Sequence, residues 1–386
     1  MKRSTRLASA ATLLCLMLTG CGTKPSPPAA ADLARSTQRP WSELDAATLR
    51  SKISRLLPAN VKDRNGWASD LQNAYSNLNI PPSPGSFCAS IAVIEQESNF
   101  QADPVVQGLP AIVQQELDQR AAKYGIPKFL VHTAMLKASP DGRSYRDRVD
   151  ALKTEKQLND LFEEMIAGIP FGARWLTGYN PIRTAGSMQV SVRFAEQHAS
   201  EKSYPYPIGK SLRDEVFTRR GGIYFGAAIL LDYPAPYDDI VYRFADFNAG
   251  RYSSRNAAFQ SALAKLSGKT LTLDGDLLRY QGGKAVDQPS SVETVLRGLS
   301  AQLRLSAGDI RRDLLLEKSA NFGQSPLFGK LFALADKSAG QPLPRQVMPQ
   351  IDLKSPKITR KLTTEWFARR VEGRYRSCLA RGEGSN

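Results

Sequence analysis

The sequence predicts a mainly α-helical protein, because apolar residues recur at helical spacing through most of the chain. Only one segment shows the alternation that is typical of paired strands, and we find neither an internal repeat nor a heptad array. With 386 residues, of which 42% are hydrophobic and 23% charged, the chain has the balance of a globular protein. Its length is sufficient for one sizeable core and a second domain.

The first 20 residues have the layout of an export signal. Three basic residues precede an apolar stretch, 7–19, that is too short to cross a bilayer as a mature helix. The stretch ends on Leu-Thr-Gly-Cys, which resembles the lipobox of bacterial lipoproteins; the alternative is a chance cysteine after an ordinary signal. The resemblance implies cleavage before Cys21 and a lipid anchor on this cysteine. Because Gly22 follows rather than Asp, it also implies the periplasmic side of the outer membrane instead of the inner membrane.

Residues 21–40 are rich in Pro, Ala and Ser and lack an apolar pattern, as is typical of a tether. Without residues 1–20, which hold three basic residues and no acid, the formal charge of +15 falls to about +12. An exported basic chain has cell-wall polymer and lipid head groups available as anionic partners. Nucleic acid is excluded by the compartment and by the lack of interleaved aromatic and basic residues. Since the basic residues are spread along the chain, a solvated surface explains the charge equally well.

Cysteine and histidine are scarce. The two histidines, His132 and His198, have no cysteine close to them in sequence, so neither a zinc site nor a Ser-His-Asp triad is expected, and we expect no metal or cofactor. In an oxidising compartment Cys88 and Cys378 can form a disulfide that ties the C-terminal segment to a central helix. Two buried free thiols are the alternative.

The first half of the chain is expected to be helical. A helix over 41–57 opens with a cap in Ser42-x-x-Asp45. Ser86 can cap a later helix that begins with the apolar run 87–94. Further helices are expected at 67–78, 109–124, 127–138 and 143–167, the last of them strongly charged and at the surface.

The second half adds one hairpin to more helices. Residues 217–231 are apolar with small residues interleaved, as in a helix that packs closely on its neighbours. Residues 269–280 hold Asp-Gly between alternating residues, which predicts a short hairpin. Helices are expected at 291–303, 307–319, 326–338 and 364–380, with a proline-rich connection at 341–356 before the last.

The helix that begins at residue 87 ends on two acids with different surroundings. Apolar residues from Phe87 to Ile94 fall on nearly every side, which is typical of a helix buried in a bundle. Glu97 falls on an apolar face beside Val93 and Ile94, whereas Glu95 points elsewhere and is expected to be structural or solvent-facing. In the last turn the helix dipole disfavours a carboxylate by roughly 0.3–1 kcal/mol, and desolvation acts the same way. Glu97 is therefore a candidate general acid; an exposed acid at a helix end is the alternative.

Four segments, in order, resemble motifs of soluble lytic transglycosylases and goose-type lysozymes. Glu-Ser-x-Phe at 97–100 resembles their opening Glu-Ser motif, and Gly-Ser-Met-Gln-Val at 186–190 resembles their Gly-Leu-Met-Gln motif. Residues 222–230 resemble the helix behind the active site, and Phe-Ala-Asp-Phe-Asn-Ala-Gly at 244–250 resembles the Ala-Tyr-Asn-Ala-Gly motif of the groove. The resemblance covers about 65–265 and implies a lysozyme-like helical catalytic domain.

The resemblance also implies residue roles. Glu97 is the catalytic acid and then the base, and Ser98 supports the end of its helix. Met188 and Gln189 line the groove beside the cleaved bond, and Asn248 contacts an N-acetyl sugar. The implied substrate-binding residues are Ser98, Ser187, Met188, Gln189, Phe247 and Asn248.

Two features depart from the family pattern. Phe247 stands where the family usually has Tyr, whose phenol can bond the catalytic carboxylate, so Glu97 loses that support unless Tyr242 or Tyr252 replaces it. About 85 residues separate Phe100 from the second motif, which predicts a helical insertion at about 105–180. This insertion and the C-terminal helices are similar to a pattern in some bacterial lipoproteins with a lysozyme-like core.

The expected organisation is a signal at 1–20, a tether at 21–40, a lysozyme-like domain at 41–265 and a helical region at 266–386. The resemblance implies a lytic transglycosylase that cleaves between N-acetylmuramic acid and N-acetylglucosamine, with one carboxylate, to leave 1,6-anhydro ends. Peptidoglycan strands would be its substrate. The alternatives are a hydrolytic muramidase and a non-catalytic peptidoglycan-binding lipoprotein that docks a cell-wall enzyme.

Overall fold

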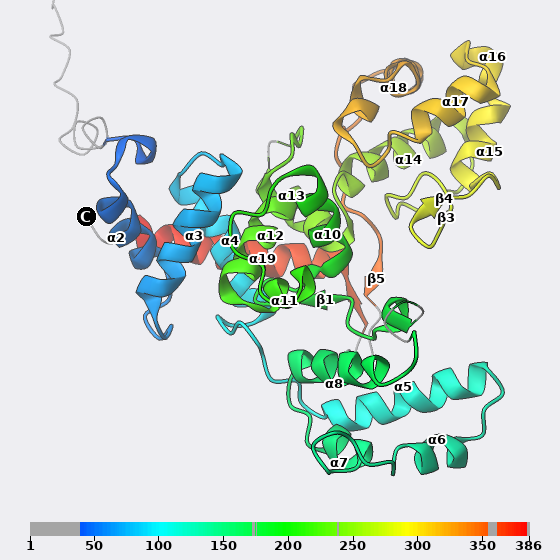
Figure 1. Cartoon of the computed structure of the whole chain (residues 1–386). Coiled ribbons are helices and arrows are strands. Elements are labelled where there is room, and N and C mark those ends of the chain that lie inside the picture. Colours follow the sequence, from blue (N-terminus) through cyan, green and yellow to red (C-terminus); the bar gives the residue numbers. More distant parts are fainter. Residues whose placement is uncertain (1–38, 172–173, 175, 238, 354–360, 384–386) are drawn as a thin grey trace, which may run out of the picture. The chain divides into compact units, whose positions relative to one another are not determined.

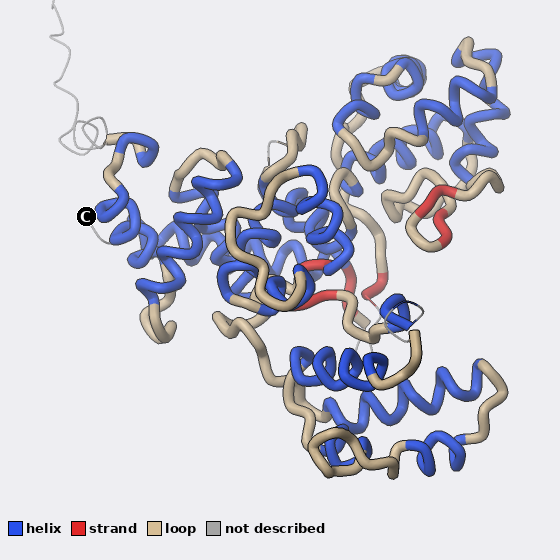
Figure 2. The backbone as a smooth tube through the Cα atoms, in the orientation of Figure 1, coloured by secondary structure: helices blue, strands red, loops and turns tan. Residues whose placement is uncertain are grey.

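The computed structural model describes residues 39–383 of the chain, apart from 172–173, 175, 238 and 354–360. In this part the fold is mainly helical, with three pairs of two-residue strands (Figures 1 and 2), which confirms the predicted class. No helix of the described part is both long and apolar enough to cross a membrane. The expected export signal and Cys21 lie outside the described residues, so the lipid anchor stays a prediction.

A first hydrophobic core surrounds α4 (Pro84–Glu97), in which every residue from Phe87 to Ile94 is buried. Ser83 caps this helix and Ser86 completes a capping box, so the predicted cap at Ser86 is wrong by three residues. Pro84 explains the difference, because its fixed φ suits the first helical position. The helices that share this core include α2 (Ala46–Leu56), α3 (Arg64–Leu78), α12 (Arg219–Leu231), α13 (Ile240–Ala249) and α19 (Thr364–Glu383).

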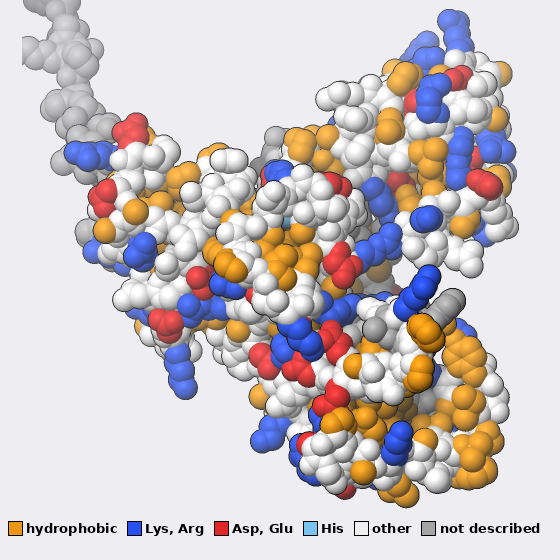
Figure 3. Space-filling view, in the orientation of Figure 1, with side chains coloured by type: hydrophobic (Ala, Val, Ile, Leu, Met, Phe, Trp, Pro, Cys, Tyr) orange, Lys and Arg blue, Asp and Glu red, His pale blue; other side chains and the backbone are white. Residues whose placement is uncertain are grey.

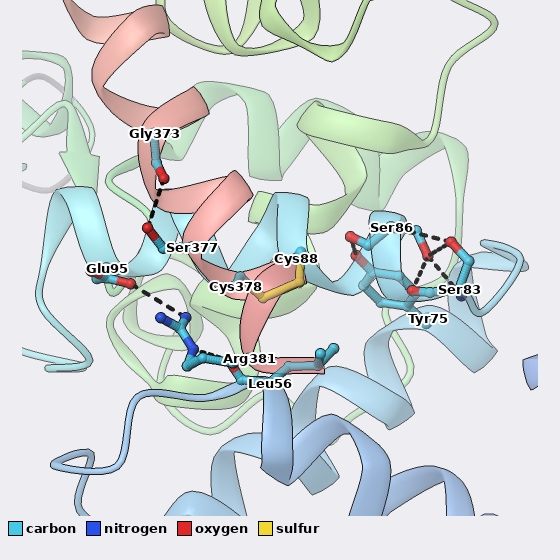
Figure 4. The surroundings of a disulfide bond; sticks show 10 residues. All are labelled: Leu56, Tyr75, Ser83, Ser86, Cys88, Glu95, Gly373, Ser377, Cys378 and Arg381. Atoms are coloured by element: carbon cyan, nitrogen blue, oxygen red, sulfur yellow. Dashed lines mark hydrogen bonds and ion pairs between the residues drawn. A yellow bond between two sulfur atoms is a disulfide. The ribbon is translucent and has the colours of Figure 1, made fainter. Parts of the chain in front are cut away.

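The C-terminal helix α19 belongs to this first core. It packs on α2, α4 and α13, and it buries Phe367 and Val371. Cys378 of α19 forms a disulfide with Cys88 of α4 (Figure 4), which decides between the two alternatives left by the sequence. The region from residue 266 onward, which was expected to form one C-terminal unit, is therefore divided. Its last helix, α19, belongs to the first hydrophobic core.

A second hydrophobic core is built by α14 (Ser253–Ser267) and the helices that follow it. Phe259 of α14 lies at its centre, 5.1 Å from the ring of Phe322 between centroids. The predicted domain boundary at 265 thus falls at the end of a helix whose apolar face serves the second core. The other helices are α15 (Ser291–Gly298), α16 (Ser300–Leu303), α17 (Ala307–Leu314) and α18 (Pro326–Ala339).

The predicted hairpin around the Asp-Gly pair at 274–275 is wrong. The strands of this region are β3 (Tyr280–Gln281) and β4 (Lys284–Ala285), which pair around a Gly-Gly turn. Gly275 instead has a φ of 82° and lies against α14, where an added Cβ would be 2.8 Å from Ser253 Cα. Its glycine serves close packing rather than a hairpin turn. A third pair, β5 (Asp352–Leu353) and β6 (Leu362–Thr363), precedes α19.

Residues 105–180, which we continue to call the insertion, are mainly helical where the structure describes them, and their place as an insertion in a lysozyme-like domain stays a prediction. The last long helix of the insertion is interrupted, however, because Ser144 and Thr154 each begin a helix with a capping box of their own. The residues expected as one helix at 143–167 therefore form two. The elements of the insertion are α5 (Leu109–Lys123), α6 (Lys128–Ala134), α7 (Tyr145–Asp150), α8 (Glu155–Ala167) and the 3-10 turn η2 (Thr177–Tyr179) (Figure 1).

A hairpin and two short helices connect the insertion to α12. Strand β1 (Thr184–Ala185) pairs with β2 (Val190–Ser191), and α10 (Val192–Glu201) and α11 (Leu212–Phe217) follow. Both helices pack on α12, and α10 and α11 also contact each other. The turn of this hairpin is the second motif of the sequence.

Candidate active site

Glu97 is the last residue of α4, and its side chain is partly exposed. Ser98 ends the helix, since its amide and its Oγ donate to the carbonyl oxygen of Ile94 at 3.0 and 3.1 Å. The predicted support of the helix end by Ser98 is confirmed. With 5% of its surface exposed, Ser98 faces inward, and the expectation that it also binds substrate stays a prediction.

The chain reverses direction directly after Ser98. Asn99 and Phe100 both lie in the left-handed region, with φ of 49° and 61°, which is uncommon for residues other than glycine. The Phe100 ring packs edge-on against Trp67 of α3, with centroids 5.4 Å apart. The burial of this ring offsets the cost of the turn and fixes the position at which α4 ends.

The second motif forms the turn between β1 and β2. Gly186 has a φ of 76°, and a Cβ there would lie 2.1 Å from the carbonyl oxygen of Val216. No other residue fits this position, because both the backbone angle and the space require glycine.

Ser187 and Met188 point into the protein. Each is fully buried, and each meets a glycine of α12: a Cβ on Gly222 would lie 3.0 Å from Ser187 Oγ, and one on Gly226 would lie 2.2 Å from Met188 Sδ. The predicted close packing of α12 is confirmed. These glycines let the turn pack into the core, so Ser187 and Met188 both face α12. The substrate contacts of Ser187 and Met188, and the place of Met188 in the groove, stay predictions.

Gln189 is the partly exposed side chain of this turn, and both ends of its amide are bonded. Thr184 Oγ1 donates to Gln189 Oε1 at 3.1 Å, and Gln189 Nε2 donates to Glu155 Oε2 at 3.3 Å. Glu155 begins α8 in the insertion and is 8% exposed. No sequence motif marks Glu155, because the contact joins segments 34 residues apart. The insertion thus contributes directly to the position of a predicted site residue.

The fourth motif ends α13. Phe247 is partly buried against the first core, whereas Asn248 is exposed. Asn248 Oδ1 accepts a hydrogen bond from Thr364 Oγ1 at 2.8 Å, and Thr364 is the first residue of α19. The C-terminal segment therefore adjoins the fourth motif, which nothing in the local sequence indicates.

Asp246 holds the corner between α13 and α14. It is fully buried and accepts hydrogen bonds from the phenols of Tyr233 (3.2 Å) and Tyr237 (2.6 Å) and from the amides of Tyr252 (2.8 Å) and Ser254 (2.7 Å). Burial raises the pKa of this carboxyl, and the hydrogen bonds oppose that rise. Asp246 is a structural acid that sets the direction in which the chain leaves Asn248.

Glu95 faces the C-terminal helix. Its carboxylate lies 4.0 Å from Nε of Arg374 on α19. It also lies 3.8 Å from Nη2 of Arg381 on the same helix, a contact drawn in Figure 4. Arg381 also donates to the carbonyl oxygen of Leu56 at 2.8 Å, so it joins α2, α4 and α19. The expectation that Glu95 is structural is confirmed, and the two acids of α4 are not equivalent.

A cavity of about 410 Å³ lies in the insertion. Apolar side chains of α5 and α8, such as Val113 and Leu161, form most of its lining. Glu155 and Thr184, the two residues that bond the amide of Gln189, also line it. The cavity thus adjoins the hairpin that carries the second motif.

Three carboxylates in the described part, those of Asp160, Glu163 and Asp214, have oxygens within 4.8 Å of one another. Lys156 lies 2.7 Å from Asp160 and 3.3 Å from Asp214, and Lys210 lies 2.7 Å from Glu163. Because each of the three acids is paired with one of two lysines, the group is an ion-pair network that joins α8 to α11.

Comparison with known proteins identifies the family. Residues 60–381 match the family described as "Protein of unknown function (DUF1615)". The chain is 45% identical over 379 residues to "Uncharacterized protein YaiW" of Escherichia coli (strain K12), a match that covers 98% of this chain and 100% of that protein. No solved structure matches the chain. Neither description names an activity, and the chain belongs to the DUF1615 family.

Proposed function

We propose that the protein is a peptidoglycan lytic transglycosylase with Glu97 as its catalytic residue. One observation carries the proposal: four motifs spread over more than 150 residues form a single packed unit. The helix α4, which ends on Glu97, packs against α12, and the glycines of α12 receive the Ser187–Met188 turn. The fourth motif lies on α13, which packs against α12 as well.

The position of Glu97 suits a side chain that must act in one direction. It ends a helix with eight consecutive buried residues. The Ser98 cap and the Phe100 turn both restrain the end of this helix. A carboxyl held in this way can be aimed at one bond.

The proposed reaction needs one carboxyl and consumes no water. Glu97 gives its proton to the oxygen between N-acetylmuramic acid and N-acetylglucosamine, and the bond from this oxygen to the anomeric carbon breaks. The acetamido oxygen of the substrate stabilises the developing cation. The Glu97 carboxylate then takes the proton of the 6-hydroxyl as that oxygen attacks the anomeric carbon. The products are a free hydroxyl end and a 1,6-anhydro sugar, and Glu97 is protonated again.

Gln189 and Asn248 would position the sugar. The hydrogen bonds from Thr184 and to Glu155 fix which end of the Gln189 amide is oxygen and which is nitrogen. Asn248 is exposed beside Thr364 and presents its amide to a ligand. Both residues thus offer oriented amide groups, as recognition of N-acetyl and hydroxyl groups requires.

A hydrolytic muramidase is the closest alternative function. Most glycoside hydrolases need a second carboxylate besides the general acid. Glu155 is the carboxylate that bonds Gln189, and this contact is the observation that favours a hydrolytic muramidase. The missing hydroxyl at Phe247 favours the other alternative, a wall-binding lipoprotein with little turnover.

We propose the periplasmic side of the outer membrane as the location, through a lipid on Cys21.

Purified sacculi incubated with the soluble mature chain test the proposal. Mass analysis of released fragments is expected to find 1,6-anhydro ends, and these should disappear with Glu97→Gln but persist with Glu95→Gln, the matched control on the same helix. Reducing ends would identify a hydrolase. No release by the wild type would refute both enzymatic functions and leave binding.

A further inference from the structure

The exposed apolar side chains of the protein are concentrated in the insertion. Of the eleven large hydrophobic residues that are exposed in the described part, nine lie between residues 105 and 179. Five of the nine form one short stretch, which we call the exposed tip (residues 122–137; Figure 3): Tyr124, Ile126, Phe129, Leu130 and Leu136. Soluble proteins rarely expose a contiguous patch of this kind unless it binds something.

The exposed tip consists of the end of α5, an ordered turn and the short helix α6. After α5 ends at Lys123, the amides of Gly125 and Ile126 bond the carbonyl oxygens of Ala122 and Ala121, at 3.0 and 2.9 Å. This is a Schellman arrangement, with Gly125 in the left-handed region at a φ of 70°. Pro127 then begins α6, which has no buried residue. The backbone thus holds the apolar side chains outward.

The charged residues within the exposed tip are all basic, and two acids of α5 border it. Between residues 119 and 140 the sequence has no Asp or Glu and four basic residues. Two of the four are paired with acids of α5: Arg120 with Glu116 and Lys128 with Asp118. The other two, Lys123 and Lys137, are exposed and form no ion pair with the acids that the structure describes. Apolar side chains with a basic surround match the interface of an anionic bilayer, where chains enter the acyl boundary and lysines meet phosphates.

We propose that the exposed tip inserts into the surface of a phospholipid membrane that contains anionic lipid. Phe129 and Leu130 enter the boundary between head groups and acyl chains, and Lys123 and Lys137 pair with lipid phosphates. Charge favours this occupant over another protein, because Asp118 already pairs with Lys128 and His132 of the tip, and the charges left over, Lys123 and Lys137, are both basic. The tip supplies a second membrane contact besides the expected lipid at Cys21, and it does not depend on the proposed enzymatic activity.

Vesicle flotation of the mature chain with Cys21→Ser, which carries no lipid, tests the proposal. The chain is expected to float with vesicles of phosphatidylcholine plus phosphatidylglycerol, and to float much less with phosphatidylcholine alone or at high salt. Phe129→Glu with Leu130→Glu should weaken binding by at least about tenfold. Lys123→Glu with Lys137→Glu should remove the preference for anionic lipid.

Two matched controls give the result its meaning. Ile208→Glu and Leu315→Glu change residues that are 50% and 54% exposed outside the tip, and they are expected to leave flotation unchanged. All variants should keep the melting temperature of the parent, because the substituted side chains are exposed. Equal loss with the controls, or equal binding to both kinds of vesicle, would overturn the proposal. A third result would also overturn it: the parent chain binds no vesicles and is an oligomer in gel filtration, whereas the Phe129→Glu/Leu130→Glu variant is a monomer. That result would assign the tip to contact with a second copy of the chain.

Discussion

Reduction of the Cys88–Cys378 disulfide is expected to weaken the first core while α19 stays docked. The bond joins residues 290 positions apart, and the chain-entropy estimate for a loop of that length is about 5–6 kcal/mol at 25 °C. Measured disulfides contribute less than such estimates, so we expect a loss of about 3–5 kcal/mol. Phe367 and Val371 also anchor α19 in this core by their burial, which is why we expect reduction to give a less stable native state and not an unfolded one.

Guanidinium and thermal denaturation, followed by circular dichroism, measure this loss. For a cooperative unit of 150–250 residues, 1 kcal/mol corresponds to roughly 2–4 °C, so the melting temperature should fall by on the order of 10 °C in reductant. The variant Cys88→Ala with Cys378→Ala is the control, because reductant should not change its curve. An unchanged wild-type curve, after mass spectrometry has shown both thiols to be free, would refute the reasoning.

Three further predictions concern stability. Asp246→Ala should cost about 3–5 kcal/mol in denaturant unfolding, since it leaves four donors without their acceptor, three of them in buried hydrogen bonds; a cost below 1 kcal/mol (about the level of a surface change) would contradict this. Burial raises the pKa of Glu317 from 4.5 to about 7, so its folded form binds a proton more tightly than its unfolded form. The second core should therefore lose about 3 kcal/mol as the pH rises from about 4.5 through 7, and Glu317→Gln should flatten this slope in melting curves. Gly226→Ala should cost about 1–3 kcal/mol by collision with Met188, and Met188→Ala should relieve part of that cost in the double variant; additive costs would show that the two residues are not coupled.

Local patterns predict the helices of this fold well, because each helix carries its own apolar period and often its own cap. They fail where two local preferences compete. Residues 143–167 keep a helical period throughout, yet the caps at Ser144 and Thr154 divide them. Asp-Gly at 274–275 has hairpin chemistry, but close packing on Ser253 uses the glycine instead. The return of α19 to α4 is a long-range contact, and the two cysteines were the only local indication of it.

The candidate site divides in the same way. Glu97 and its Ser98 cap follow from the pattern of one helix, and the packing of α12 follows from its glycines. The direction in which the Met188 side chain points does not follow from the sequence. A turn motif does not determine which of its side chains face the core. Glu155 and Thr364 bond predicted site residues from distant segments, so only the folded chain brings them to notice.

Digestion of sacculi in water enriched in ¹⁸O tests whether Glu97 directs attack by the sugar's own 6-hydroxyl. A transglycosylase adds no water, so the wild type is expected to release anhydro fragments, each lighter by one water than a hydrolysis product and free of ¹⁸O. Glu97→Gln should release none of them, while Glu95→Gln should match the wild type. Wild-type fragments that carry ¹⁸O at a reducing end, or equal release by Glu97→Gln, would contradict the assignment.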